Sequence, residues 1–221
     1  MAAHEPRPAA LPPTHPPRAP APSRSSPLSD TFPDPLLPSR GTPSSQTSTM
    51  APTIKVGDTI PDAQLGYVPY SPELEDPIVC GLPSKISTHK DWKGKKVVIF
   101  GIPGSFTKTC SENHLPPYVT EYDQFKSKGV DSIYCIASND LFVQSAFGRV
   151  QKTGDKVVCV GDPELKFLEP AGLTQDLSHV GFGVRAKRFA LVVDDLKVTY
   201  VGIEEGPGVS SSGAEAVLAK L

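Results

Sequence analysis

The sequence predicts an α/β domain that follows a long disordered tail. In residues 51–221, short apolar runs rich in β-branched residues alternate with segments of helical periodicity, which is the pattern of βαβ units. Residues 1–50 contain 13 of the 25 prolines and one of the 18 glycines. They show neither the periodicity of a helix nor that of a strand. A segment of this composition buries too little apolar surface to offset its ordering entropy. We therefore expect residues 1–50 to be a disordered Pro/Ser-rich tail or a targeting extension.

The elements expected in residues 51–221 follow from the apolar runs and the helix breakers between them. Apolar runs of five to seven residues predict buried strands at 96–102, 132–137 and 157–161. A hairpin with strands at 189–193 and 198–202 is expected around Asp194-Asp195. Helical spacing predicts helices at 110–128, 141–151 and 212–221, with a short helix near 164–169. Because proline lacks a backbone N–H, the first of these helices should break or kink at Pro116-Pro117.

Cys110 is the residue with the clearest chemical consequence. The strand at 96–102 runs into a Gly/Pro turn, and Cys110 stands where the next helix begins. The first N–H groups of a helix lack partners, and the peptide dipoles place partial positive charge there, so the thiolate form of a cysteine is favoured. Thr107 is placed to donate its hydroxyl to the sulfur, and Pro103 fixes the loop. The alternative is that Cys110 is a small apolar residue on a helix.

The run from Pro103 to Cys110 reads Pro-Gly-Ser-Phe-Thr-Lys-Thr-Cys and resembles the Pro-x-x-x-Thr-x-x-Cys signature of peroxiredoxins. From about residue 54 to 221 the chain is similar to the type II group of plants and fungi and its mammalian atypical two-cysteine relatives, within the AhpC/TSA–redoxin superfamily. The resemblance implies a thioredoxin-like fold, with a central mixed sheet flanked by helices. It also implies a thiol peroxidase that reduces hydrogen peroxide and organic hydroperoxides through a Cys110 sulfenic acid. Further shared stretches are residues 111–116, 126–131, 138–140 and 187–194.

The same resemblance assigns roles to other residues. Arg188 would supply a fixed cation that stabilises the thiolate and donates to the peroxide oxygens, whereas the sequence alone suggests an exposed charge at the entry to a strand. Pro103 would shape the loop that screens the sulfenic acid. His114 lies four residues after Cys110 on the same helix face, where it either perturbs the thiolate or packs in the core. No Cys or His pair has metal-ligand spacing, so we expect no metal and no other cofactor.

Two cysteines are candidates for the residue that resolves the sulfenic acid, and the sequence does not decide between them. Cys135 lies in a predicted strand, where packing is the default role, although plant relatives carry a cysteine there that pairs with the reactive one. Cys80 lies in a loop-like segment and is the other candidate, whereas Cys159 is expected in the core. Mammalian relatives use a cysteine near the C-terminus, where this chain has Ser210-Ser211-Ser212. The expected reductant is therefore external, either glutaredoxin with glutathione or thioredoxin.

Composition and charge restrict the other functions. A net charge of −2 gives no reason to expect nucleic-acid or anionic-membrane binding, and no apolar run approaches the ~18 residues that span a bilayer. A phosphate-binding loop fails because Ile102 stands where its first glycine should be, and Thr107 where a glycine should precede Lys108. We expect a homodimer. The alternative function is a non-enzymatic thiol redox sensor or a chaperone-like binding module.

The last three residues suggest a cellular address. Ala219-Lys220-Leu221 is close to the Ser-Lys-Leu signal that directs proteins to peroxisomes. We therefore expect a cytoplasmic pool with peroxisomal import. Residues 1–50 contain arginine and serine and few acids, as mitochondrial transit peptides do, so mitochondria are the alternative. A second translation start at Met50 would give a form without this tail.

Overall fold

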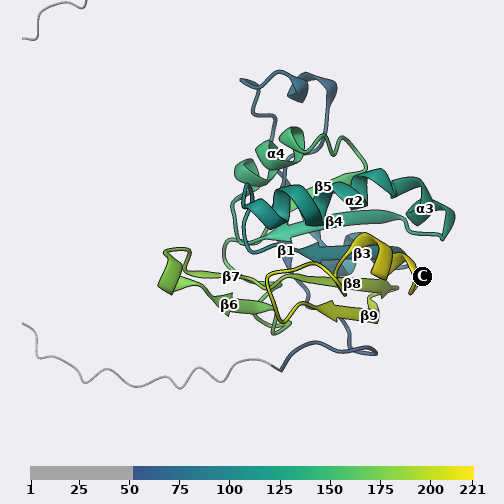
Figure 1. Ribbon diagram of the computed structural model, residues 1–221. Coiled ribbons are helices and arrows are strands. Elements are labelled where there is room, and N and C mark those ends of the chain that lie inside the picture. The colour runs from purple at the N-terminus through teal and green to yellow at the C-terminus, as the bar shows by residue number, and fades with distance from the viewer. Residues whose placement is uncertain (1–51) are drawn as a thin grey trace, which may run out of the picture. The chain divides into compact units, whose positions relative to one another are not determined.

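The centre of the fold is a mixed sheet of seven strands, which the computed structural model describes within residues 52–221 (Figure 1). The central strands β5, β4 and β3 are parallel, and antiparallel pairs close both edges of the sheet. In spatial order the strands are β2 (Ser84–Ser87), β1 (Gln64–Tyr67), β5 (Val157–Gly161), β4 (Ser132–Ala137), β3 (Lys96–Gly101), β8 (Phe189–Asp194) and β9 (Lys197–Ile203).

Most of the predicted elements are confirmed. Strands β4 and β5 coincide with their predicted ranges, β3 ends one residue early, and the closing helix is the shorter α5 (Ala214–Leu218). The helix at 141–151 is α4 (Leu141–Val150), and the carboxylate of Asp140 caps it by accepting the N–H groups of its second and third residues. The hairpin β8–β9 is also confirmed, but its turn lies at Asp195-Leu196, where both residues have positive φ.

The predicted break at Pro116-Pro117 is wrong. After Cys110 the chain forms η2 (Cys110–His114), a turn of π-helix, and continues as α2 (Leu115–Thr120). Both prolines lie in the first turn of α2, directly after the π-helical turn, and the helix runs through them. The interruption comes instead at Glu121, before α3 (Tyr122–Ser127).

The prediction of a short helix near 164–169 is also wrong, because this segment forms turns. Leu165 has φ of 58°, which a right-handed helix does not allow. The carboxylate of Asp162 accepts the N–H groups of Lys166, Phe167 and Leu168, so these donors are satisfied without a helix.

Several short elements escaped prediction. Strands β1 and β2 have four residues each and alternate too briefly to stand out from a loop. A separate two-stranded ribbon projects from the fold (Figure 1). The other elements missed are η1 (Pro72–Glu75), α1 (Thr88–Asp91), β6 (Thr174–Asp176), η3 (Ser178–Val180) and β7 (Val184–Ala186).

The sheet separates two apolar clusters, as the alternation of side chains along β3 requires. Val97 and Ile99 face one cluster, together with Trp92. Val98 and Phe100 face the other, which is covered by α2, α4 and α5. Figure 1 shows α2, α3 and α4 lying together on one side of the sheet. The functional thiol is expected on this helix-covered side.

Two expectations remain, one on membrane-spanning helices and one on the N-terminal residues. No helix within residues 52–221 is long and apolar enough to cross a membrane. The predicted disordered or targeting tail, residues 1–50, lies outside the described residues.

Candidate active site

Cys110 lies in the first helical turn after β3 and is fully buried in the helix-covered cluster. The N–H of Leu115 bonds the carbonyl of Cys110, five residues back, so the helix is widened by one residue at this turn. Single π-helical turns of this kind are frequent at functional sites. The expected position of the cysteine at the start of the helix is therefore confirmed.

Arg188 reaches the sulfur of Cys110 with both terminal nitrogens. Nη1 and Nη2 each lie 3.5 Å from Sγ, and the arginine is only 8% exposed. The antiparallel pairing of β3 with β8 opposes Gly101 to Phe189, which brings Arg188 beside the end of β3. Any side chain at Gly101 would meet the ring of Phe189, since a Cβ there would lie 2.0 Å from a ring carbon. The alternative of an exposed charge at Arg188 is therefore wrong.

His114 is buried and connects Arg188 to the segment before α5. Its Nε2 lies 2.9 Å from the carbonyl oxygen of Ser212, and its Nδ1 lies 3.2 Å from Nη1 of Arg188. A carbonyl can only accept, so Nε2 carries the proton and Nδ1 accepts from the guanidinium. Burial lowers the pKa of His114 to about 4; the nearby Arg188 charge acts in the same direction and the Ser212 carbonyl opposes it. The ring is therefore neutral near pH 7, and this keeps Nδ1 free to accept from Arg188.

The loop between β3 and Cys110 differs from expectation in one bond. The hydroxyl of Thr107 donates to the carbonyl of Gly104 at 2.9 Å, rather than to the sulfur of Cys110. This bond leaves the lone pairs of the hydroxyl oxygen able to accept from another donor. Pro103 is half-buried at the start of the loop, and Phe106 is 53% exposed with φ of 64°.

Polar residues after β4 hold this loop, and the sequence analysis did not assign them a role. The side-chain oxygen of Asn139 accepts from the backbone N–H of Ser105 at 3.1 Å and lies 3.4 Å from Nη1 of Arg185. The hydroxyl of Ser105 donates to Gln144 in α4. A signal was available, because β3 and β4 are parallel neighbours and the loops that follow such strands meet at one edge of the sheet.

The remaining cysteines differ in exposure. Cys135 is buried and lies directly opposite Cys159 in the pairing of β4 with β5. Burial raises the pKa of the Cys135 thiol well above its ordinary value, and the hydrogen bond to Cys159 adds to this effect. A thiol in this environment is a weak nucleophile. Cys80 is exposed in the loop before β2, and all four cysteines, including Cys110, are free thiols.

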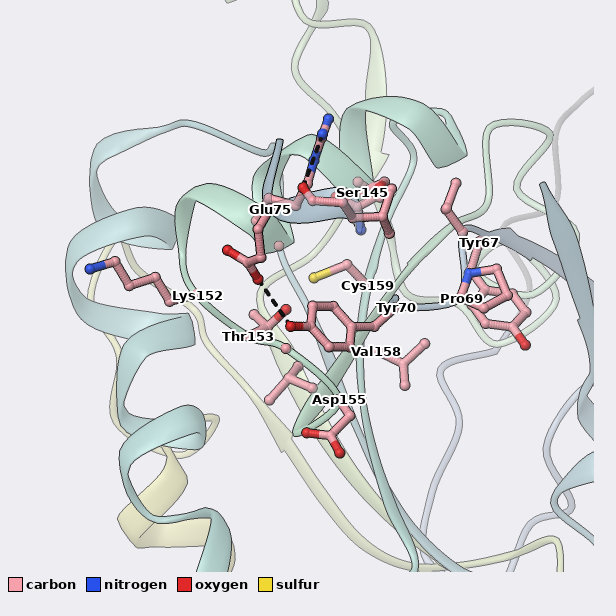
Figure 2. Close-up of a pocket in the computed structure, with 17 residues that line it drawn as sticks. Tyr67, Pro69, Tyr70, Glu75, Ser145, Lys152, Thr153, Asp155, Val158 and Cys159 are labelled. Carbon is pink, nitrogen blue, oxygen red and sulfur yellow. Dashed lines mark hydrogen bonds between the residues drawn. The ribbon is translucent and has the colours of Figure 1, made fainter. Parts of the chain in front are cut away.

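A cavity that Figure 2 shows lies apart from this site. It has a volume of about 210 Å³ and lies between α4, β5 and residues 67–75. Figure 2 shows Cys159 directed into it, opposite Tyr70 and Glu75, whose side chains are joined by a hydrogen bond. Cys110, Thr107 and Arg188 do not line it. Cys110 is instead fully buried in the helix-covered cluster.

Comparison with known proteins identifies the family of this chain. The Redoxin family matches residues 55–218. A Malassezia furfur protein named as a peroxiredoxin is 50% identical over 167 residues, 76% of this chain and 100% of that protein. Peroxiredoxin-2C of Oryza sativa subsp. japonica is 42% identical over 172 residues, 78% of this chain and 100% of that protein. A Lipomyces kononenkoae protein, named as a peroxisomal peroxiredoxin, is 41% identical over 161 residues, 72% of this chain and 96% of that protein.

Among solved structures, the chain is similar to reduced Prx3 of Vibrio vulnificus in complex with hydrogen peroxide. The two are 34% identical with a TM-score of 0.66, and the match covers 76% of this chain and 95% of that one. The fold and these relatives together define the class as a thiol-dependent oxidoreductase of thioredoxin-like fold. Within that class the chain belongs to the redoxin family and is a peroxiredoxin, a thiol-dependent peroxidase.

Proposed function

We propose that Cys110 is the nucleophile of this peroxidase and that Arg188 holds it as a thiolate. The observation that carries this proposal is the buried guanidinium that directs two nitrogens at one sulfur. The ion pairs within residues 52–221 are Lys108–Glu112 and Lys166–Glu164, so no carboxylate of that part of the chain balances Arg188. An isolated buried charge is costly. A thiolate at Cys110 supplies the anion that balances it.

The proposed reaction begins with attack of the Cys110 thiolate on the terminal oxygen of a hydroperoxide. The S–O bond forms as the O–O bond breaks, and the alkoxide or hydroxide that leaves takes up a proton. Arg188 and the N–H groups of the first helical turn stabilise the negative charge that moves onto the leaving oxygen. The hydroxyl oxygen of Thr107 accepts a hydrogen bond from the peroxide and orients it. Pro103 shapes the loop that screens the resulting sulfenic acid.

Hydrogen peroxide and small organic hydroperoxides are the proposed substrates. The Vibrio vulnificus relative has been crystallised in its reduced form with hydrogen peroxide, which supports the small peroxide. In this chain the loop before Cys110 carries an exposed aromatic side chain, Phe106, which would contact the alkyl part of a larger hydroperoxide. No cofactor enters the proposed cycle.

An external thiol is the proposed reductant, either glutathione with glutaredoxin or thioredoxin. The sulfenic acid first forms a mixed disulfide with the donor and releases water, and a second thiol then restores Cys110. Burial of Cys135 argues against that thiol as the partner in the reduced fold. Cys80 is exposed but lies in a loop with no contact to Cys110 among the described hydrogen bonds.

Intact-protein mass spectrometry after one equivalent of hydrogen peroxide tests this proposal. We expect the mass of one added oxygen, located on Cys110, and no loss of two hydrogens from the chain. Peptide mapping after thiol blocking would locate the oxidised residue. An internal disulfide from Cys110 to Cys80 or Cys135 would overturn the external reductant, and oxidation elsewhere would overturn the role of Cys110.

We also propose one catalytic domain over residues 51–221 and a homodimeric assembly. The family match over 55–218 supports the domain. Exposed aromatic side chains at Phe142 and Phe182 are apolar surface that association with a second copy would bury.

Peroxisomal import of a cytoplasmic protein is the proposed localisation, and mitochondria are the alternative. The Lipomyces kononenkoae relative is named for that organelle, and the C-terminal Ala219-Lys220-Leu221 resembles its import signal. A fluorescent protein fused upstream of a free C-terminus should give puncta that disperse when Leu221 is deleted. Puncta that persist after the deletion, or mitochondrial fluorescence, would contradict the import signal.

A further inference from the structure

We infer that Glu204 is a positioning residue for the reaction of Cys110, acting through Ser212, His114 and Arg188. The inference rests on the proposed roles of Cys110 and Arg188 and adds a residue that touches neither the sulfur nor the peroxide. Glu204 lies just after the last strand, β9, and begins the segment that leads to α5.

The carboxylate of Glu204 organises the serine segment before α5. Oε1 accepts from the N–H of Ser210 at 2.6 Å, the N–H of Ser212 at 2.7 Å and the Ser212 hydroxyl at 2.8 Å. Oε2 accepts from the Ser210 hydroxyl at 2.6 Å. Burial raises the pKa of Glu204, but these bonds together outweigh it and lower the pKa to about 2. The carboxylate is therefore ionised throughout the pH range in which a thiol peroxidase works.

The carbonyl of Ser212 is the next link. Ser212 is fully buried, and its carbonyl oxygen accepts from His114 Nε2 at 2.9 Å and from the Tyr118 hydroxyl at 2.6 Å. Because this carbonyl fixes which nitrogen of His114 carries the proton, it decides that Nδ1 accepts from Arg188. Moving Ser212 would release the imidazole and, with it, one side of the guanidinium.

Glu204 also contacts the backbone of Arg188, the last residue in this series of contacts. Its backbone N–H donates to the carbonyl of Arg188 at 2.9 Å. One residue thus fixes the arginine backbone directly and the arginine side chain through Ser212 and His114. Both nitrogens that approach Cys110 at 3.5 Å belong to this side chain. Since small displacements of a catalytic group cost much in rate, the carboxylate should affect the chemistry from a distance.

Three variants test this role. Glu204→Ala removes all four hydrogen bonds, whereas Glu204→Gln keeps an amide oxygen that can accept the two N–H groups in place of Oε1. Glu205→Ala is the matched control, because Glu205 is the exposed neighbour and has no side-chain hydrogen bond among the described residues. The second-order rate of the peroxide step and its pH profile are measured in the full chain, with the melting temperature and with Cys110→Ser alongside.

We expect Glu204→Ala to lower the peroxide rate at pH 7 by about 10-fold or more and to move its pH profile to higher pH. Glu204→Gln should recover most of the rate, and Glu205→Ala should match the wild type. A merely structural role would lower the melting temperature and leave the rate and pH profile of the folded enzyme unchanged. That result would overturn the inference, as would a folded Glu204→Gln variant no better than Glu204→Ala.

If Glu204→Ala does not fold, Ser212→Ala takes its place, because it removes one donor to the carboxylate and keeps the backbone. A shift of its pH profile in the same direction supports the inference, and an unchanged profile overturns it. A different result would contradict the proposed function. Full activity in Cys110→Ser would overturn the assignment of the nucleophile, whereas an inactive Cys110→Ser beside an unaltered Glu204→Ala would overturn only the role of Glu204.

Discussion

Replacement of Cys110 by serine is expected to reduce peroxide turnover to the uncatalysed background. A serine hydroxyl is not ionised near neutral pH, so it offers no anion to attack the O–O bond and none to balance Arg188. The guanidinium, 3.5 Å from the sulfur in the wild type, would then stabilise a peroxide without a nucleophile beside it. A coupled assay with hydrogen peroxide and an excess of thiol reductant measures this loss.

The matched control is Cys80→Ser, which removes the exposed thiol and leaves the three buried ones. This variant should keep the rate of the first, peroxide-dependent step. Substantial turnover by Cys110→Ser in the presence of Cys80 would mean that another thiol reacts with peroxide, and would contradict the proposed mechanism.

The local sequence was sufficient to place Cys110 at the start of a helix and to find most of the strands around it. The run before Gly101 is β-branched and buried on both faces, so β3 was predictable from composition alone. Gly and Pro after it end the strand, and this places Cys110 at the beginning of a helix. Strands β4 and β5 were predictable for the same reason, and they form the parallel centre of the sheet. The thioredoxin-like topology depended on resemblance to a family.

The surroundings of the thiol could not be predicted from local pattern, because they depend on strands far apart in the sequence. Arg188 reads as a surface charge until β8 pairs with β3 and brings it beside the sulfur. His114 has the spacing of a helix neighbour, but its role depends on the Ser212 carbonyl, 98 residues away. The hydroxyl of Thr107 was expected to donate to the sulfur, yet it donates to the carbonyl of Gly104. Which of two nearby acceptors receives a hydroxyl proton depends on the three-dimensional arrangement of the loop.

Replacement of Arg188 by alanine is expected to slow the peroxide step by roughly 10²-fold or more, which is typical for loss of one preorganised electrostatic donor. Without the guanidinium, a buried thiolate at Cys110 would have no cation beside it, and the charge on the leaving oxygen would lose its fixed donor. Stopped-flow measurement of the first turnover, across a range of pH, separates this effect from later reduction by the thiol donor.

Arg188→Lys makes the prediction more specific, because it keeps the positive charge and loses the two-nitrogen geometry of the guanidinium. A lysine ammonium is a point charge that cannot direct two nitrogens at one sulfur while a third contact goes to His114. We therefore expect Arg188→Lys to lie much closer to Arg188→Ala than to the wild type. Lys187→Ala, which removes the adjacent cation bonded to the Gly172 carbonyl, should leave the peroxide rate unchanged. A fully active Arg188→Lys would mean that positive charge alone holds the thiolate, and that the bidentate geometry and its support by His114 contribute little to catalysis.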